Sequence, residues 1–454
     1  MTSLVSFVIV IGILILIHEL GHFIVARWTG VGVERFSIGF GPVLLRWRGK
    51  ETEYCLSAIP MGGYVKMMGE ENPLEGSGSD IVDPAKSFAL KPLWARGLIV
   101  FAGPGMNFVL AAAIFAGVFV FIGRPVLPAT LGRIQPVGPA AQAGLRTGDR
   151  VTAAEGRPIA HWEDLLRVVQ EANGETIQLV VRRGDEERKV ALTPARIKVR
   201  DIFGDERETW DFGARPYVPA KIGEVLPSYP AAQAGLKSGD AVVALDGTPV
   251  GSWDDLAEEI RKRPGRPVRL TVERGGQTLT VAVIPQATKE RGPTGEEIDV
   301  GRVGISPIPA VAYVRSNPLV AAAEGVARTV EMTALTAVGL WKLVTRQLPI
   351  STIGGPIQIA VSAGEQAKQG MTSLAFFTAV ISVNLALLNL LPVPMLDGGH
   401  LLFFAIEAVL GRPLALRKRE RAQQVGFLLL LLLMVLAVYN DLVKNADQIF
   451  RFFR

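Results

Sequence analysis

The stretch SFVIVIGILILIHELGHFIVA, residues 6–26, combines the length of a membrane-spanning helix with three ionisable side chains near its end. The apolar run around it covers Thr2–Ala26 and holds one carboxylate, Glu19; the first charge after it is Arg27. A bilayer core requires about 20 largely apolar residues in a helix. The stretch therefore predicts a membrane span.

A secretory signal peptide is the alternative for this stretch. Signal peptides begin with a basic segment and end at a cleavage site of small residues, and residues 1–26 show neither clearly. A discarded segment would also have no need of ionisable groups in its apolar run. We expect a retained span.

The composition of the chain agrees with a membrane protein. Of its 454 residues, 49% are hydrophobic and 20% are charged, whereas typical soluble chains are about 25% charged. Cys55 is the single cysteine, which excludes a scaffold of intrachain disulfides. The net charge of +5 is mild, and nucleic acid is not an expected partner.

Three further blocks have the length and apolar character of spans, and none carries a charge: Leu98–Ile122, Met371–Met395 and Ala422–Asn440. A fifth block, Pro318–Val344, contains two glutamates, an arginine and a lysine. These charges predict a helix at the membrane interface or against the bundle. The expected fold class is thus a polytopic α-helical membrane protein with four transmembrane helices.

Basic residues in the connecting segments predict the orientation. The segment after the first span begins at Arg27 and includes Arg35, and the segment 411–421 is rich in arginine and lysine. Cytoplasmic loops carry an excess of these residues. We therefore expect both segments in the cytoplasm, and the segment 123–370 and both termini on the extracytoplasmic side.

The long segment between the second and third spans contains a duplication. Pro139–Leu145 reads PAAQAGL and recurs as Pro230–Leu236, 91 positions later. A Gly-Asp pair follows each copy, and a WEDL or WDDL segment begins at Trp162 or Trp253. Two copies without a net insertion predict two small domains of one fold.

In each copy, short alternating strands surround one helix, and the pattern AxxAGL–xxGD resembles tandem PDZ domains of the bacterial type. The resemblance covers about 125–200 and 218–287. It implies domains that bind an extended peptide or protein segment as an added strand at a sheet edge. A spacer or size barrier that binds nothing is the alternative.

The chemistry of the first span lies in His18-Glu19-Leu20-Gly21-His22. Histidines at i and i+4 share one helical face and can bind one metal ion. The glutamate can take a proton from a water that the metal activates. An ionisable group at bilayer depth costs about 3 kcal/mol, so three in one turn indicate a functional site. Structural histidines and a proton relay are the alternatives.

A catalytic zinc site usually has three protein ligands and one open position. The expected third ligand is Asp397, in the segment NLLPVPMLDGG that begins at Asn389. At about 1.5 Å per helical residue, Asp397 and His18 reach similar depths near the cytoplasmic side. Cys55 and His400 are the rival ligands.

Together these motifs resemble the site-2 protease family of intramembrane zinc metalloproteases. The resemblance rests on HELGH in the first span and NxxPxPxLDG late in the third, and includes GFGP, PMGGYVK and AGPGMN between them. It implies that His18, His22 and Asp397 hold Zn²⁺, and that Glu19 accepts and returns the proton. It also implies a bacterial inner-membrane enzyme.

The resemblance also suggests substrate contacts. Asn389 and Asn384 would bind the substrate backbone; hydrogen bonds to neighbouring helices are the alternative. Residues 43–66 resemble the membrane-associated β-hairpin region of the family. Its strand, with Tyr54 and Leu56, would pair with an unwound substrate helix.

The expected substrates are single-pass membrane proteins already trimmed outside the membrane, such as an anti-sigma factor or a remnant signal peptide, in regulated intramembrane proteolysis. A membrane metal transporter and a PDZ scaffold are the alternative functions. Transporters commonly repeat their membrane halves, whereas the repeat in this sequence lies between the spans.

The expected order of segments follows from these predictions. It is a first span 1–26, a cytoplasmic or membrane-associated region 27–97, a second span 98–122, PDZ domains 125–200 and 218–287, an interfacial helical region 315–370, a third span 371–397, a cytoplasmic loop 398–421, a fourth span 422–443 and an extracytoplasmic tail 444–454.

Overall fold

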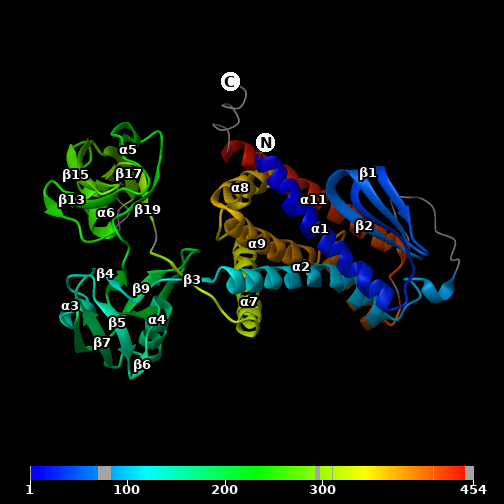
Figure 1. The fold of residues 1–454 in the computed structure, drawn as a ribbon. Helices are drawn as coiled ribbons and strands as arrows, with labels where there is room; N and C mark the ends of the chain where they lie inside the picture. Colours follow the sequence, from blue (N-terminus) through cyan, green and yellow to red (C-terminus); the bar gives the residue numbers. More distant parts are fainter. Residues whose placement is uncertain (1, 70–82, 292–296, 309, 413, 445–454) are drawn as a thin grey trace. The chain divides into compact units, whose positions relative to one another are not determined.

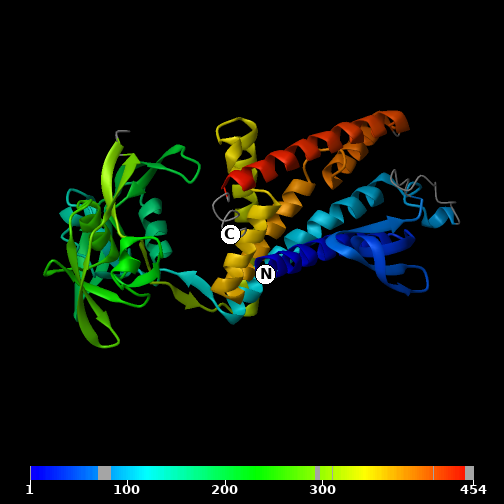
Figure 2. The same cartoon turned by 90° about the horizontal axis from the view of Figure 1, so that it is seen from above.

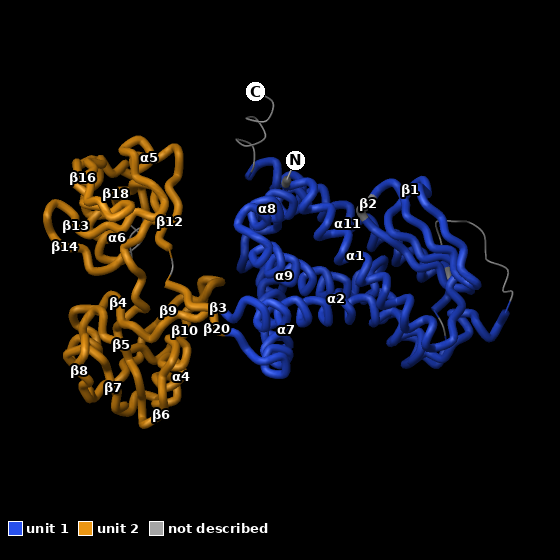
Figure 3. The backbone as a smooth tube through the Cα atoms, viewed as in Figure 1, with its two compact units in different colours: residues 1–124, 315–454 blue, residues 125–314 orange. Residues whose placement is uncertain are grey.

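The computed structural model describes residues 2–69, 83–291, 297–308, 310–412 and 414–444. The chain divides into two compact units: Pro125–Val314, and the segments before and after it (Figure 3). The segments before and after Pro125–Val314 form the first, helical unit, and the duplicated segment forms the second unit, Pro125–Val314. Of the expected tail 444–454, residues 445–454 lie outside the described residues.

Within the described residues, four helices of the helical unit are long and apolar enough to cross a membrane. They are α1 (Thr2–Trp28), α2 (Leu93–Phe121), α9 (Met371–Asn389) and α11 (Leu416–Lys444). The unit also contains α7 (Pro318–Val344), α8 (Pro356–Gln369), α10 (Asp397–Leu410), η1 (Pro84–Lys86) and η2 (Ile350–Thr352). Figures 1 and 2 both show α1 alongside α2.

Glycine allows the helices to pack closely on α2. A Cβ at Gly21 of α1 would overlap the carbonyl oxygen of Ala102, and one at Gly325 of α7 would lie 2.6 Å from the carbonyl oxygen of Ala112. Small residues let helix backbones approach where lipid provides no hydrophobic drive between them. α7 therefore packs against the bundle, crossing α2 steeply (Figure 1).

The third apolar helix differs from the expected span 371–397. α9 ends at Asn389, residues 390–396 form a turn, and Asp397 begins α10. Pro392 and Pro394 explain the break, since neither has a backbone N–H to continue the helix. The segment 398–421, expected as a loop, consequently contains most of α10.

The segment after α1 forms a bent four-ribbon sheet rather than a simple hairpin. β1 (Val33–Arg48) and β2 (Glu53–Met67) pair antiparallel at 43–48 with 53–57 and at 33–38 with 63–67, and both strands bend so that 35–38 also lies beside 53–56, in parallel register. The resulting order of ribbons is 43–48, 53–57, 33–38 and 63–67. Gly39 and Gly62 have positive φ at the bends, where other residues would be strained.

The second unit consists of two copies of one fold, each with a four-stranded sheet of the same order, β6-β5-β7-β8 and β14-β13-β15-β16. The first copy contains β4 (Leu131–Ile134), α3 (Pro139–Gln142), β5 (Arg150–Ala154), β6 (Arg157–Pro158), α4 (Trp162–Glu171), β7 (Ile177–Arg183), β8 (Glu186–Leu192), β9 (Ala195–Arg200), β10 (Glu206–Asp211) and β11 (Ala214–Pro216). The second contains β12 (Ile222–Val225), α5 (Pro230–Gln233), β13 (Ala241–Leu245), β14 (Thr248–Pro249), α6 (Trp253–Arg261), β15 (Val268–Arg274), β16 (Gln277–Val283), β17 (Gln286–Arg291), β18 (Glu297–Arg302) and β19 (Ile305–Pro307). β3 (Arg124–Val126) pairs with β20 (Ala312–Val314) where the chain enters and leaves the unit.

Each copy is longer than the expected ranges 125–200 and 218–287. The last strand returns to pair with the first, β11 with β4 and β19 with β12. Ala214 belongs to the core of the first copy, and Val303 to that of the second. The returning strands pair with residues far along the chain, a relation that local sequence patterns do not reveal.

A buried ion pair recurs in both copies. Asp149 and Asp240 are each 1% exposed, and each accepts two hydrogen bonds from one guanidinium, that of Arg183 or Arg274. The guanidinium of Arg274 lowers the pKa of the Asp240 carboxyl, against the opposing effect of burial. Each pair joins the start of one strand to the end of another.

Replacing Arg274 should make the second copy sensitive to acid. Because the pKa of Asp240 is lowered in the fold, the pair stabilises it above about pH 4, the ordinary aspartate range, and this contribution is lost as pH falls further. Arg274→Gln should therefore unfold the second copy at a higher pH than the wild type. Pepsin cleavage of the full chain at stepped pH, with fragments identified by mass spectrometry, measures this.

Arg266→Gln is the matched control, since this exposed arginine forms no ion pair among the described residues. Cleavage of the second copy at the same pH in both variants would contradict the prediction. Cleavage of the first copy, which keeps Arg183, should not change.

Candidate metal centre

Two helices bring together the three side chains expected to bind metal. Nε2 of His18 lies 3.1 Å from Oδ2 of Asp397, and Nε2 of His22 lies 3.6 Å from its Oδ1. The two Nε2 atoms are 3.2 Å apart. Both histidines are buried, and the carboxylate is partly buried. The side chains of α1 and of the first turn of α10 thus form one cluster.

The spacing of this cluster suits a tetrahedral metal ion. Ligand atoms about 2.0–2.1 Å from a tetrahedral centre lie about 3.3 Å from one another, close to the three distances of 3.1, 3.2 and 3.6 Å. Two imidazoles and one carboxylate form a donor set that zinc accepts, with a fourth position left open. The residues present therefore fit the metal that the resemblance implies.

Groups on α2 orient both imidazole rings. Nδ1 of His22 donates to the carbonyl oxygen of Ile99 at 2.8 Å, and Nδ1 of His18 lies 3.3 Å from Nδ2 of Asn107. Gly103 lies between these positions; a Cβ there would overlap the His22 ring and lie 2.8 Å from Nε2 of His18. The missing side chain at residue 103 therefore lets α2 approach the cluster.

The turn between α9 and α10 directs Asp397 toward α1. Met395 has φ 101°, a conformation in which a residue with a side chain is strained by about 1–3 kcal/mol. A Cβ at Gly399 would lie 2.7 Å from Cα of Pro394. This tight turn holds the carboxylate at the start of α10, where the sequence predicted a ligand at the end of a span.

Glu19 shares one cavity of about 250 Å³ with His18 and Asp397. The cavity is lined by Ile15, His18, Glu19, Gly62, Gly63, Leu385, Asn389, Met395, Leu396 and Asp397. A Cβ at Gly63 of β2 would lie 3.1 Å from Cγ of Glu19. Two of the candidate ligands, the expected proton acceptor and two glycines of β2 therefore line a single cavity.

The two asparagines expected to contact substrate lie in different surroundings. Asn389 lines the cavity. Oδ1 of Asn384 accepts a hydrogen bond of 2.8 Å from Thr336 of α7, which corresponds to the helix-packing alternative. A substrate contact by Asn389 stays a prediction.

Tyr54 and Leu56 do not line this cavity. They border a separate hollow on the sheet with Phe36 and Trp47, and the Tyr54 ring stacks on Trp47. Their ribbon, 53–57, has paired neighbours on both sides. Its backbone groups are thus already engaged, and a substrate strand would need an outer ribbon of the described sheet, such as 63–67, instead.

The two rival ligands lie outside the cluster. Cys55 is a buried residue of β2. Nδ1 of His400 lies 3.3 Å from Nη2 of Arg419, and burial, reinforced by the charge of Arg419, lowers the pKa of His400. Among the described residues, only His18, His22 and Asp397 bring three donor atoms of this kind together.

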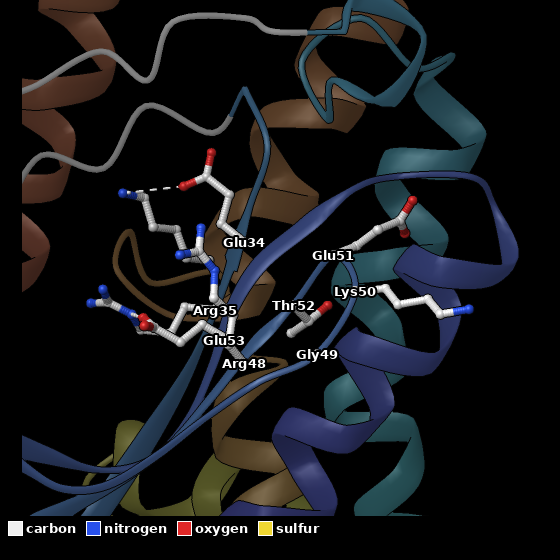
Figure 4. Close-up of a pocket in the computed structure, with 9 residues that line it drawn as sticks. Glu34, Arg35, Arg48, Gly49, Lys50, Glu51, Thr52 and Glu53 are labelled. Atoms are coloured by element: carbon white, nitrogen blue, oxygen red, sulfur yellow. Dashed lines mark hydrogen bonds and ion pairs between the residues drawn. The ribbon is translucent and has the colours of Figure 1, made fainter.

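A polar hollow of about 420 Å³ lies at the turn between β1 and β2. Figure 4 shows Lys50 and Glu51 pointing away from Glu34, which pairs with Lys66. Glu53 likewise pairs with Arg35. These pairs make the hollow a charged surface of the turn, separate from the cavity at Glu19.

Sequence reasoning missed the contacts of Asn107, Gly62 and Gly63 with the cluster. The signal for Asn107 was available, since an amide inside an apolar span needs a partner just as Glu19 does. The glycines gave no comparable signal, because their place beside Glu19 depends on how the sheet folds back.

Comparisons with known proteins extend over both units. The family model described as peptidase family M50 matches residues 6–433. Regulator of sigma-E protease RseP of Escherichia coli (strain K12) is 38% identical over 464 residues, 97% of this chain and 98% of that protein. Its counterpart in Salmonella typhimurium (strain 14028s / SGSC 2262) is 36% identical over 466 residues, with the same coverage. A relative in Neisseria meningitidis serogroup A, named as a zinc metalloprotease, is 37% identical over 467 residues, 98% of this chain and 99% of that protein.

Adding one methyl group at residue 103 should weaken metal binding. In Gly103→Ala the new Cβ would overlap the His22 ring, so α2 or the ring must shift, and overpacking of this kind costs about 1–3 kcal/mol. We expect metal affinity to fall about tenfold or more. Competition between purified full-length protein and a chromophoric chelator for Zn²⁺ or Co²⁺ measures it.

Gly117→Ala is the matched control on the same helix, because a Cβ there meets nothing within 4 Å. It should bind metal as the wild type does. Equal affinities for wild type and Gly103→Ala would show that the close packing at residue 103 does not position the ligands.

Proposed function

This chain belongs to peptidase family M50, and on that premise we propose how its metal centre hydrolyses peptide bonds. The chain is a zinc metalloprotease of the membrane, as the motifs in its first and third spans predicted. The residues that carry out the reaction, the substrate and the orientation in the membrane are the parts that we propose.

His18, His22 and Asp397 are the zinc ligands in this proposal. The observation that carries it is the spacing of their donor atoms, 3.1–3.6 Å, around a common centre beside Glu19. Zinc held by these residues would supply Lewis acidity toward water and the scissile carbonyl. His22 supports the assignment, because its Nδ1–H donates to Ile99 and leaves Nε2 free to ligate.

Glu19 is the general base and then the general acid. It lines the same cavity as His18 and Asp397, where its carboxylate can accept a proton from the attacking water. It then passes the proton to the leaving amine as the peptide bond breaks. A catalytic carboxylate in this place accounts for the energetic cost of a glutamate in the first apolar helix.

The substrate enters as an extended strand in this proposal, since a peptide bond must leave its helix before hydrolysis. In the described sheet, ribbon 63–67 is the outer ribbon next to ribbon 33–38, and an extended substrate would add to the sheet at this end. Gly62 and Gly63 of β2 line the cavity, and so does Asn389, whose side chain can bind the substrate backbone.

The membrane topology follows the distribution of basic residues. The bent sheet and the segment between α9 and α11 face the cytoplasm, and Pro125–Val314 and both termini face the other side of a bacterial inner membrane. The two copies in Pro125–Val314 are tandem PDZ domains in this proposal. Their common sheet order and the shared PAAQAGL segment support two domains of one fold.

The substrates are single-pass membrane proteins whose external part another protease has already removed, such as an anti-sigma factor or a remnant signal peptide. A cavity within an apolar bundle suits a membrane segment. The bulk of Pro125–Val314 supports a size filter that delays substrates with large external domains.

Glu19→Gln should abolish cleavage without removing the metal ligands. We expect at least a hundredfold loss, because general acid–base catalysis contributes about 10²–10⁴-fold. The test co-expresses a tagged single-pass substrate without its external domain, with wild type or variant, and measures the smaller fragment. His161→Ala is the control, since this histidine lies in the first copy, paired with Asp164.

Comparable fragment levels with wild type and Glu19→Gln would overturn the role of Glu19. Absence of a fragment with the wild type, although zinc is bound, would favour a transporter or a scaffold.

Replacing residues 127–311 with a short Gly/Ser linker should remove the size filter. The linker is feasible because β3 and β20, at the ends of the unit, are paired. We expect cleavage of a substrate with an intact external domain to rise severalfold, while cleavage of its trimmed form stays constant. Unchanged relative rates would contradict a filter.

A further inference from the structure

Asn107 is a fully buried amide in the middle of α2. Its side chain contacts His18, with 3.3 Å between Nδ2 and Nδ1. Its Oδ1 has no hydrogen-bond partner among the described residues. Its backbone oxygen accepts a hydrogen bond of 2.8 Å from Ser382 of α9. The backbone of Asn107 is thus held in place, while its side-chain amide makes one contact of this kind, with His18, in the described part of the chain.

The two histidine ligands differ in what determines their tautomers. A neutral imidazole carries one proton, and a ring that ligates through Nε2 must carry it on Nδ1. For His22 the backbone carbonyl of Ile99 enforces this, because a carbonyl can only accept. The neighbour of His18 is an amide, which can accept through Oδ1 or donate through Nδ2.

The orientation with Nδ2 toward His18 suits a ring protonated on Nε2, which cannot ligate through that atom. A half-turn of the amide about Cβ–Cγ places Oδ1 at the same position and pairs it with Nδ1–H. Because Oδ1 has no other partner among the described residues, this turn breaks no further hydrogen bond there.

We propose that Asn107 is a positioning residue for the metal centre: its Oδ1 accepts the hydrogen bond from Nδ1–H of His18 and holds that ring in the tautomer that ligates through Nε2. This inference rests on the proposed function, since it needs His18 as a ligand. It adds a residue from α2 to a centre whose ligands come from α1 and α10.

The test measures zinc affinity by chelator competition on the purified full chain, with no cleavage assay involved. Asn107→Leu removes the acceptor at similar volume and should weaken binding about 10–100-fold, the usual effect of losing an outer partner of a ligating histidine. Asn107→Asp keeps an acceptor at the same place and should stay within about threefold of the wild type or bind more tightly.

Ser382→Ala is the matched control, because it removes the hydrogen bond to the backbone of Asn107 and leaves the contact with His18. It should bind zinc as the wild type does. Wild-type affinity in Asn107→Leu would overturn the inference. If Asn107→Leu does not fold, the zinc affinity of Asn107→Asp decides the question. A tenfold or greater loss of zinc affinity in Asn107→Asp would also overturn the inference.

His18→Ala separates this inference from the proposed function. Loss of the site in His18→Ala together with unchanged binding in Asn107→Leu would reject the role of Asn107 alone. Unchanged zinc binding in His18→Ala would reject the proposed metal centre itself.

Discussion

The cost of placing ionisable groups among apolar helices governs the arrangement of the helical unit. His18, Glu19 and His22 lie in a helix otherwise long and apolar enough to cross a membrane. Each such group would cost about 3 kcal/mol unpaired. Contacts of the histidines with Asp397, Ile99 and Asn107 offset this cost. These partners lie on α10 and α2, so three helices, α1, α2 and α10, must meet at one place.

This requirement explains features that would otherwise look unrelated. Glycine at residues 21 and 103 lets α1 and α2 approach until Ile99 and Asn107 reach the rings. The proline break after α9 turns the chain so that Asp397 begins a new helix. That helix is held to α2 by a bond of 2.6 Å between Glu407 and Arg96, whose guanidinium lies over the ring of Phe404.

The sequence predicted what depends on local chemistry. The i, i+4 histidines, the apolar blocks and the 91-residue repeat each have a local signature, and the expected cluster of His18, His22 and Asp397 follows from two of them. Pro392 and Pro394 indicated a break before Asp397, but the sequence did not predict that Asp397 begins a new helix, or the inner position of Tyr54 and Leu56. These depend on how segments fold back on one another, as β1 and β2 do.

The two copies of the second unit have diverged at one corresponding place. The second copy has a hollow of about 280 Å³ that is lined by residues of α6, by Gly301 of β18 and by Val303, which follows that strand. At the equivalent positions, 91 residues earlier, the first copy has Trp210 and Phe212, and Phe212 is fully buried against Trp162. In the first copy, the larger side chains of Trp210 and Phe212 therefore take up space that is open in the second copy. A unit that acts only as a size filter does not require this difference between the copies. The open hollow therefore makes the second copy the one in which a ligand-binding role can be distinguished from a role as a size filter.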